Sequence, residues 1–203
     1  MRPLDTVSTG RREATKQANR LAILDAAREV FADLGYGEAT VRDIVRRTDL
    51  ATGTFYNYFP DKEAVFRALA DESATQVRVR VRAARRGART LEEFVSSAYR
   101  AYFEYLVSDP TAFALTRRNS GTIRQLFDEP ALGAGTDELE TDLRDGIAAG
   151  LVPDHDARLM ASAMVGAGFE IAVRMLESDP PDVDGAVAFA TNLFLGGLQR
   201  LER

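Results

Sequence analysis

The residues best suited to binding chemistry lie between Thr40 and Lys62. Phe55 and Phe59 are four residues apart, which turns both rings toward the core in a helix running from about residue 51 to residue 59. The residues left largely free to face outward are Thr52, Gly53, Thr54, Tyr56, Asn57 and Tyr58. A short helix whose exposed face carries hydroxyls, an amide and rings, but no acid, suits contact with a phosphate backbone and with base edges.

A second short helix must precede this one to position it. Residues that can form one buried stripe recur at i, i+3, i+4 and i+7, and they are Val41, Ile44, Val45 and Thr48. Thr40 is placed to cap this helix, with Asp43 as the acid of a capping box. Three arginines, at positions 42, 46 and 47, lie off the stripe. A solvated face is a possible role for all three, and it fits Arg47 best.

A longer helix is predicted upstream, from about Lys16 to Leu34, because apolar residues repeat there at helical spacing. Gly35 supplies the left-handed residue that ends this helix, and residues 35–39 form a connector. Three helices within about 45 residues satisfy the requirement of a helix-turn-helix domain. Residues 1–16 are expected to be a disordered arm, interpreted either as a solvated tail or as a basic segment that touches DNA.

The segment Gly53–Lys62, GTFYNYFPDK, and the helices before it resemble the DNA-binding domain of tetracycline-repressor-type (TetR-type) transcriptional regulators. The resemblance covers residues 19–66, and beyond them only size and helical pattern agree. It implies a homodimer on double-stranded operator DNA, with two recognition helices in successive major grooves. It also implies an all-helical core that binds a small-molecule effector.

The resemblance further assigns roles to individual residues. Those that match positions commonly near bases are Arg42, Thr52, Gly53 and Tyr56. Those that match positions commonly near phosphate are Thr40, Val41, Thr54, Asn57, Tyr58 and Lys62. Packing on the first helix is the alternative for both tyrosines, and a simple charge at a helix start is the alternative for Lys62.

Two residues depart from the family pattern. Asp49 stands where the family usually has the turn glycine, and Asp tolerates the left-handed region better than most residues. Ala51 stands where a capping serine is frequent. The recognition helix is therefore expected to fray at its start or to use Asp49 or Thr52 as a substitute cap.

Composition fits DNA binding only because the charge is unevenly distributed. The 203-residue chain has a formal net charge of -5, which by itself argues against a nucleic-acid partner. Residues 1–62 hold ten Lys and Arg against nine Asp and Glu, or +1, so residues 63–203 hold sixteen against twenty-two, or -6.

The absence of cysteine excludes disulfides and cysteine-bound metals. The polar start and the lack of a long apolar run predict a cytoplasmic protein with no membrane partner.

The rest of the chain is also predicted to be helical. A helix over about residues 62–86 links the two parts, and its arginines from 78 onward are interpreted as a solvated or acid-paired face. Thr90 with Glu93 caps a buried helix, and Asp109–Pro110 opens a shorter one that is expected to end at residues 117–119. An acidic loop is expected at 128–135, before helices at about 136–150, 156–176 and 182–201.

An apolar or aromatic effector is predicted to bind among large side chains of this second part. The predicted lining is Tyr99, Tyr102, Phe103, Phe113, Phe127, Met160, Met164 and Phe169, with Arg117 as an anchor for a ligand carboxylate. Residues of these types at helical spacing also make ordinary core, and an arginine in a last helical turn also serves the helix dipole.

The last two helices carry more apolar surface than one core requires, which favours a partner subunit. The predicted dimer interface is Gly166, Val173, Val187, Ala190, Phe194, Gly197, Leu198 and Leu201. The resemblance points to the same two helices, and packing within one chain is the alternative.

Enzymatic chemistry is not expected. His155 is the only histidine, and it lies between Asp154 and Asp156 in a turn, where a cap or loop role fits better than a metal site. No cofactor or metal is predicted.

The sequence thus predicts an all-α protein with an arm at 1–16, a helix-turn-helix domain at 17–61 and a ligand-binding and dimerisation domain at 62–203. The predicted function is a homodimeric repressor released from a palindromic operator by its effector. The alternatives are a constitutive DNA-binding dimer and a helical enzyme or carrier.

Overall fold

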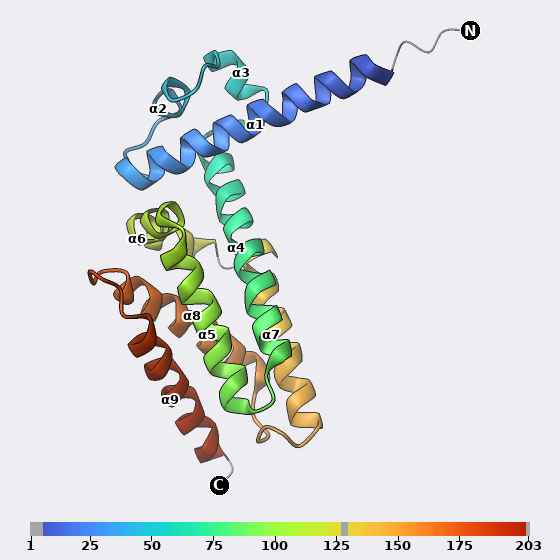
Figure 1. Ribbon diagram of the computed structural model, residues 1–203, viewed down its shortest axis with the longest axis vertical. Helices are drawn as coiled ribbons and strands as arrows, with labels where there is room; N and C mark the ends of the chain where they lie inside the picture. Colours follow the sequence, from blue (N-terminus) through green and yellow to red (C-terminus); the bar gives the residue numbers. More distant parts are fainter. Residues whose placement is uncertain (1–5, 127–129, 202–203) are drawn as a thin grey trace. The chain divides into compact units, whose positions relative to one another are not determined.

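The computed structural model describes residues 6–126 and 130–201, and these residues form nine helices without a strand (Figure 1). The all-α class predicted from the sequence is confirmed. The helices fall into two compact units, residues 1–69 and 70–203, so the division lies inside α4 (Lys62–Gly87) and not at its start. Within the described ranges, no helix has both the length and the apolar character that crossing a bilayer requires.

The first unit consists of α1 (Thr6–Leu34), α2 (Val41–Arg46), α3 (Thr52–Tyr56) and the beginning of α4. Each helix buries an apolar face, as the repeat of its side chains predicts. Phe31 of α1 and Phe66 of α4 meet edge to face with ring centroids 5.2 Å apart. The ring of Tyr36, in the connector after α1, lies beside both of them. These three rings join α1, the connector and α4 in one aromatic cluster.

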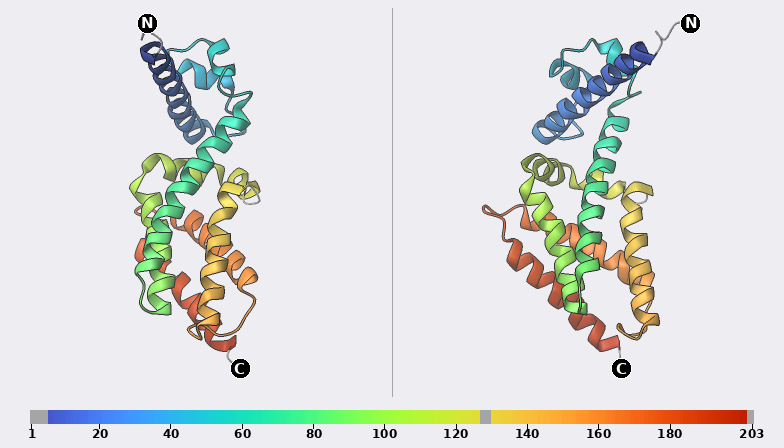
Figure 2. Two further views of the ribbon diagram at one scale, coloured as in Figure 1. Left: turned by 90° about the vertical axis from the view of Figure 1, so that its right-hand side faces the viewer. Right: turned by 45° about the vertical axis from the view of Figure 1, so that its right-hand side comes forward.

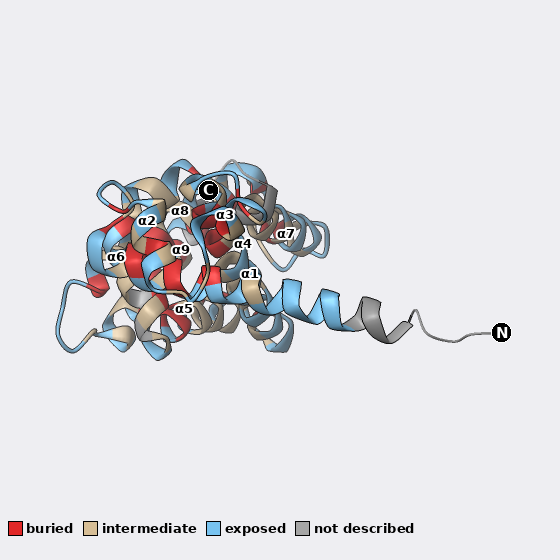
Figure 3. Cartoon of the chain, turned by 90° about the horizontal axis from the view of Figure 1, so that it is seen from above, coloured by how far each residue is buried: buried red, intermediate tan, exposed pale blue. Residues whose placement is uncertain are grey.

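α1 begins at Thr6, well before the predicted start at about Lys16. The expected disorder is therefore wrong for residues 6–16, while residues 1–5 lie outside the described part of the chain. Every residue from Arg11 to Ala18 is exposed (Figure 3). Arg, Glu, Ala, Lys and Gln are frequent in this segment, and such residues favour a helix without a packing partner. A helix without a buried stripe gives no apolar periodicity in the sequence.

In the second unit, α5 (Leu91–Ser108) packs along α9 (Val183–Leu201) and also contacts α6 (Pro110–Gln125), as Figure 2 lets the reader follow. α7 (Pro130–Ala148) packs on α8 (Ala157–Met175), and α8 in turn contacts α9 and α6. The predicted Thr90 cap of α5 and the predicted Asp109 cap of α6 are both confirmed.

Tyr99 lies at the centre of this second unit. Its ring stacks on Phe103 at 5.7 Å and on Phe194 of α9 at 6.1 Å. Its buried hydroxyl donates a hydrogen bond to the carbonyl of Met164 in α8 at 2.9 Å, and burial raises the pKa of this phenol far above its usual value. A Cβ on Gly168 would lie 2.8 Å from the Tyr99 ring, so a glycine is needed where α8 passes it. Tyr99 thereby ties α5, α8 and α9 together.

Two predicted helix boundaries are wrong. α6 continues through the expected break at residues 117–119, where the backbone of Asn119 is non-helical, with φ -120° and ψ 20°. The buried Asn119 amide donates to the Leu115 carbonyl at 2.8 Å, so the break is present as a kink. α7 begins at Pro130, a residue type that suits a first helical turn. The loop expected at 128–135 is therefore helical at 130–135, and residues 127–129 lie outside the described ranges.

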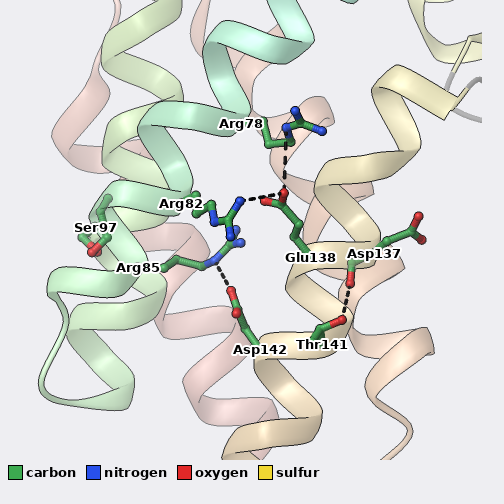
Figure 4. A network of polar contacts seen from close by, with 9 residues as sticks. Arg78, Arg82, Arg85, Ser97, Asp137, Glu138, Thr141 and Asp142 are labelled. Atoms are coloured by element: carbon green, nitrogen blue, oxygen red, sulfur yellow. Dashed lines mark hydrogen bonds and ion pairs between the residues drawn. The ribbon is translucent and has the colours of Figure 1, made fainter.

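The arginines of the second half of α4 pair with acids of α7 (Figure 4). Arg78 and Arg82 lie 3.9 Å and 3.4 Å from one carboxylate oxygen of Glu138. Arg85 is buried, and its Nε donates to Asp142 at 2.8 Å. The predicted acid-paired face is confirmed, and these three side chains hold α4 against α7.

Four residues of the predicted dimer stripe on α9 face the core of their own chain, which favours the alternative of packing within one chain. Val187, Ala190, Phe194 and Leu198 are all buried without any partner chain. Gly166 and Val173 of α8 are half-buried and Gly197 is exposed, whereas the side chain of Leu201 is not described. The exposed apolar residues of α9 are instead Phe189 and Leu193, which are 61% and 51% exposed. Periodicity located a buried stripe correctly but could not say which chain covers it.

Candidate nucleic-acid interface

The predicted capping box fixes the start of α2. The Thr40 hydroxyl accepts from the Asp43 N–H at 3.2 Å and donates to the Asp43 carboxylate at 2.5 Å, while the Thr40 N–H donates to the same carboxylate at 3.0 Å. The hydrogen bond from the hydroxyl and then that from the backbone lower the pKa of Asp43. The carboxylate is therefore held ionised against its own helix, whose N-terminus it stabilises.

α3 presents the outward face that the sequence predicts, although the helix ends at Tyr56 and not at Phe59. Phe55 and Phe59 are buried as expected. Thr52, Gly53, Tyr56 and Asn57 are exposed, and Thr54 is half-buried. On α2, Arg42 is exposed and Val41 is half-buried. We call the five exposed residues Arg42, Thr52, Gly53, Tyr56 and Asn57 the recognition face.

The turn between α2 and α3 is built differently from the prediction. Among the described residues only Gly35 and Gly150 have positive φ, so Asp49 does not adopt the left-handed conformation expected of it. Thr48 stabilises the turn instead, since its hydroxyl donates to the Val45 carbonyl at 2.9 Å and accepts from the Leu50 N–H at 3.2 Å. Sequence reasoning assigned Thr48 only to the buried stripe of α2 and missed this role.

Three residues predicted or considered as DNA contacts, Tyr58, Arg47 and Lys62, are engaged within the protein. Tyr58 is half-buried, and its hydroxyl accepts from the Asn19 amide of α1 at 3.2 Å, which favours the alternative of packing on α1. Arg47 lies 2.8 Å from Asp33 and 3.5 Å from Glu29, both on α1. These contacts fix the α2–α3 pair on α1.

Lys62, the first residue of α4, departs most from the predicted phosphate contact. Its ammonium group donates to the carbonyls of Tyr36, Gly37 and Ala39 at 2.7, 3.1 and 2.8 Å. The nitrogen also lies 4.7 Å from the centre of the Tyr36 ring. An ammonium has three hydrogens, so all of them are used within the protein. Lys62 therefore closes the connector in this structure and leaves no N–H for a phosphate.

Residues 23–69, which contain this whole arrangement, match the family model described as bacterial regulatory proteins, tetR family. The chain is a TetR-family transcriptional regulator. An uncharacterised HTH-type transcriptional regulator of Haemophilus influenzae is 26% identical over 119 residues. That alignment spans 58% of this chain and 58% of the Haemophilus protein, so the two are compared over little more than half of their length.

Solved structures of two FadR proteins match nearly the whole TetR-family chain. The fatty acid degradation regulator FadR of Bacillus halodurans is 27% identical with a TM-score of 0.76, over 88% of this chain and 95% of that one. The regulator FadR of Bacillus subtilis, solved in complex with stearoyl-CoA, is 27% identical with a TM-score of 0.70, over 89% and 96%. The similarity thus extends well beyond the DNA-binding domain.

Most of the residues predicted to bind an effector lie in the interior of the second unit. Tyr99, Tyr102, Phe103, Met160 and Met164 belong to one hydrophobic cluster, and Phe169 is buried in α8. Arg117 is exposed, which disfavours its predicted role as an anchor inside an apolar site. The side chain of Phe113 and the whole of Phe127 lie outside the described residues. Thr191 of α9, which sequence reasoning missed, has a buried hydroxyl with no hydrogen-bond partner among the described residues.

Ala51 generates a prediction about the stability of α3. Its backbone already has the extended N-cap conformation, with φ -72° and ψ 151°, but no side chain caps the helix. We expect Ala51→Ser to raise the free energy of unfolding by about 1 kcal/mol, because the serine hydroxyl can accept a hydrogen bond from a backbone N–H in the first turn of α3. Chemical denaturation of the first unit measures this change. Ala51→Val, which supplies no acceptor, is the matched control, and an equal gain in both variants would contradict the prediction.

Proposed function

We propose that this TetR-family regulator is a homodimeric repressor that binds a palindromic operator and is released from it by an effector with a long apolar chain. The observation that carries the proposal is the recognition face, whose polar and aromatic side chains stand outside the buried Phe55 and Phe59 and include no acid. Such a face offers donors and acceptors to base edges and phosphates without repelling them. A weak net charge of +1 over residues 1–62 makes two copies of this face necessary for tight binding.

The second copy is proposed to attach through the outer faces of α8 and α9. Phe189 and Leu193 of α9 are exposed at i, i+4 spacing, and the exposed Gly197 follows on the same helix. On α8, Leu159 is 68% exposed, and half-buried Gly166 lies two turns further along. Large apolar residues beside small ones allow two helix pairs to approach closely. This face replaces the stripe of Val187, Ala190, Phe194 and Leu198. Half-sites one helical turn apart would require the two α3 helices of such a dimer to lie about 34–36 Å apart.

The effector is proposed to be a long-chain acyl-CoA, since the Bacillus subtilis FadR to which the chain is similar was solved with stearoyl-CoA. The buried side chains of α5 and α8, among them Tyr99, Phe103 and Met164, would surround the acyl chain. The unpartnered Thr191 hydroxyl would donate to a carbonyl of the effector, which removes the cost of an unsatisfied buried donor. A ligand that separates these helices would displace α4, and α4 continues into the DNA-binding unit.

Operator binding should depend on Arg42 and not on the other exposed arginines. Because the Arg42 guanidinium would lie against the DNA, we expect Arg42→Gln to weaken operator binding and to lower the slope of log affinity against log salt by about one neutralised charge. Arg86→Gln is the matched control, because Arg86 is exposed in the last turn of α4. Fluorescence anisotropy of a labelled duplex across a salt series measures both quantities. Equal effects of the two substitutions would show that the charge acts only through bulk attraction.

The dimer should depend on Leu193. A lysine at this position would bury an unpaired charge in the interface, so Leu193→Lys should raise the dimer dissociation constant by about a hundredfold or more. Val79→Lys is the matched control, because Val79 is 61% exposed on α4 and lies outside the proposed interface. Size-exclusion chromatography with light scattering gives the masses. A dimer that survives Leu193→Lys, or a wild-type monomer, would contradict the proposed interface.

Stearoyl-CoA should release the operator, and coenzyme A without the acyl chain should not. By linkage, operator DNA must lower the affinity for stearoyl-CoA by the same factor by which stearoyl-CoA lowers the affinity for DNA. Isothermal titration of stearoyl-CoA with and without operator tests this equality. Thr191→Val, which keeps the side-chain shape, should weaken stearoyl-CoA binding. Equal stearoyl-CoA affinity in both titrations would refute the proposed release.

A further inference from the structure

Lys62 holds a connector whose carbonyl groups converge on one point. Gly35, with φ +81°, ends α1, and the Ala39 N–H donates to the Gly35 carbonyl at 3.1 Å, which folds residues 35–39 into a compact turn. The carbonyls of Tyr36, Gly37 and Ala39 all accept from the Lys62 ammonium group. Hydrogen bonds from a charged donor are stronger than neutral ones, so three of them on one group give a firm attachment.

The surroundings of Lys62 fix its position further. The Tyr36 ring lies under the ammonium nitrogen and packs against Phe31 and Phe66 at 5.8 and 5.0 Å. Asp61, directly before Lys62, caps α4 by accepting from the Ala64 N–H at 2.7 Å. The side chain is therefore held at its root by a capped helix and at its tip by three carbonyls and a ring.

The connector leads directly into α2. Ala39, one of the three acceptors, precedes Thr40, which is the N-cap of α2 and half of its capping box. α2 is joined to α3 by the turn that Thr48 stabilises. A displacement of the first residue of α4 would therefore move the start of α2, and with it the recognition face.

We infer that Lys62 is a positioning residue that sets the orientation of α2 and α3 from the start of α4, and that it does not contact the operator backbone. This inference rests on the proposed operator binding. It differs from the sequence prediction in mechanism, because a phosphate contact adds charge to the interface whereas a positioning residue alters only geometry. The salt dependence of binding separates the two mechanisms, since it counts neutralised phosphates.

Lys62→Met and Lys62→Arg in the full chain test the inference, with Arg42→Gln as the control that removes a proposed direct contact. We expect both Lys62 variants to weaken operator binding by about tenfold or more while the salt slope stays at the wild-type value. Arginine should not restore binding, because a planar guanidinium cannot direct three hydrogens at the three convergent carbonyls. The ratio of operator affinity to affinity for a scrambled duplex should fall, whereas partial unfolding alone would lower both affinities equally.

Amide hydrogen exchange without DNA gives a readout that does not depend on operator binding. In both Lys62 variants the amides of Ala39, Asp43 and Ile44 should exchange about tenfold faster or more, with the amides of residues 91–108 as an unchanged internal reference. A salt slope lowered by about one contact together with rescue by arginine would overturn the inference. Unchanged exchange at these amides would also overturn it. A wild-type chain that binds no DNA would refute the proposed function, and the exchange measurement would still decide the role of Lys62.

Discussion

The attachment of the Lys62 ammonium group to the connector carbonyls is the interaction on which the DNA-binding unit depends. The unit is small, and α2 and α3 together span few residues, so their own hydrogen bonds cannot fix their orientation. Contacts from longer elements supply what is missing. Lys62 holds the start of α2 from α4, while Arg47 and Tyr58 hold the pair against α1. Basic and aromatic side chains, which are types that commonly contact DNA, are thus used within the protein to position the surface proposed to bind it.

This use of charge explains how a regulator with a net charge of -5 can present a binding surface. Within the second unit, Arg78, Arg82 and Arg85 are neutralised by Glu138 and Asp142, so the most basic run of the chain serves to pack α4 on α7. The recognition face keeps only one arginine, Arg42, beside hydroxyl, amide and aromatic groups. Affinity would then come from accurate placement of two such faces, and this placement depends on α4, which reaches from Lys62 into the unit proposed to bind the effector.

The sequence predicted correctly the features that depend on residues within a single helix. The i, i+4 pair of Phe55 and Phe59 identified the face of α3, and the Thr40 and Asp43 spacing identified the cap of α2. It did not predict the features that depend on how one helix packs against another part of the fold. Periodicity cannot tell whether Val187 and Phe194 meet their own chain or a partner, and a lysine gives no sign of which acceptors the fold will bring to it. The exposed start of α1 was missed because its helix has no buried side to reveal it.

Lys62 is proposed to make the recognition face able to bind DNA by positioning α2 and α3, and not by placing its charge at the DNA. The most direct measurement is the position of the Lys62 Nζ in a crystal structure of the chain bound to its selected operator duplex. We expect Nζ to stay within hydrogen-bonding distance of the carbonyls of Tyr36, Gly37 and Ala39 while Arg42 and Tyr56 contact the DNA. A Lys62 Nζ bonded to a phosphate oxygen, with the connector carbonyls released, would contradict it.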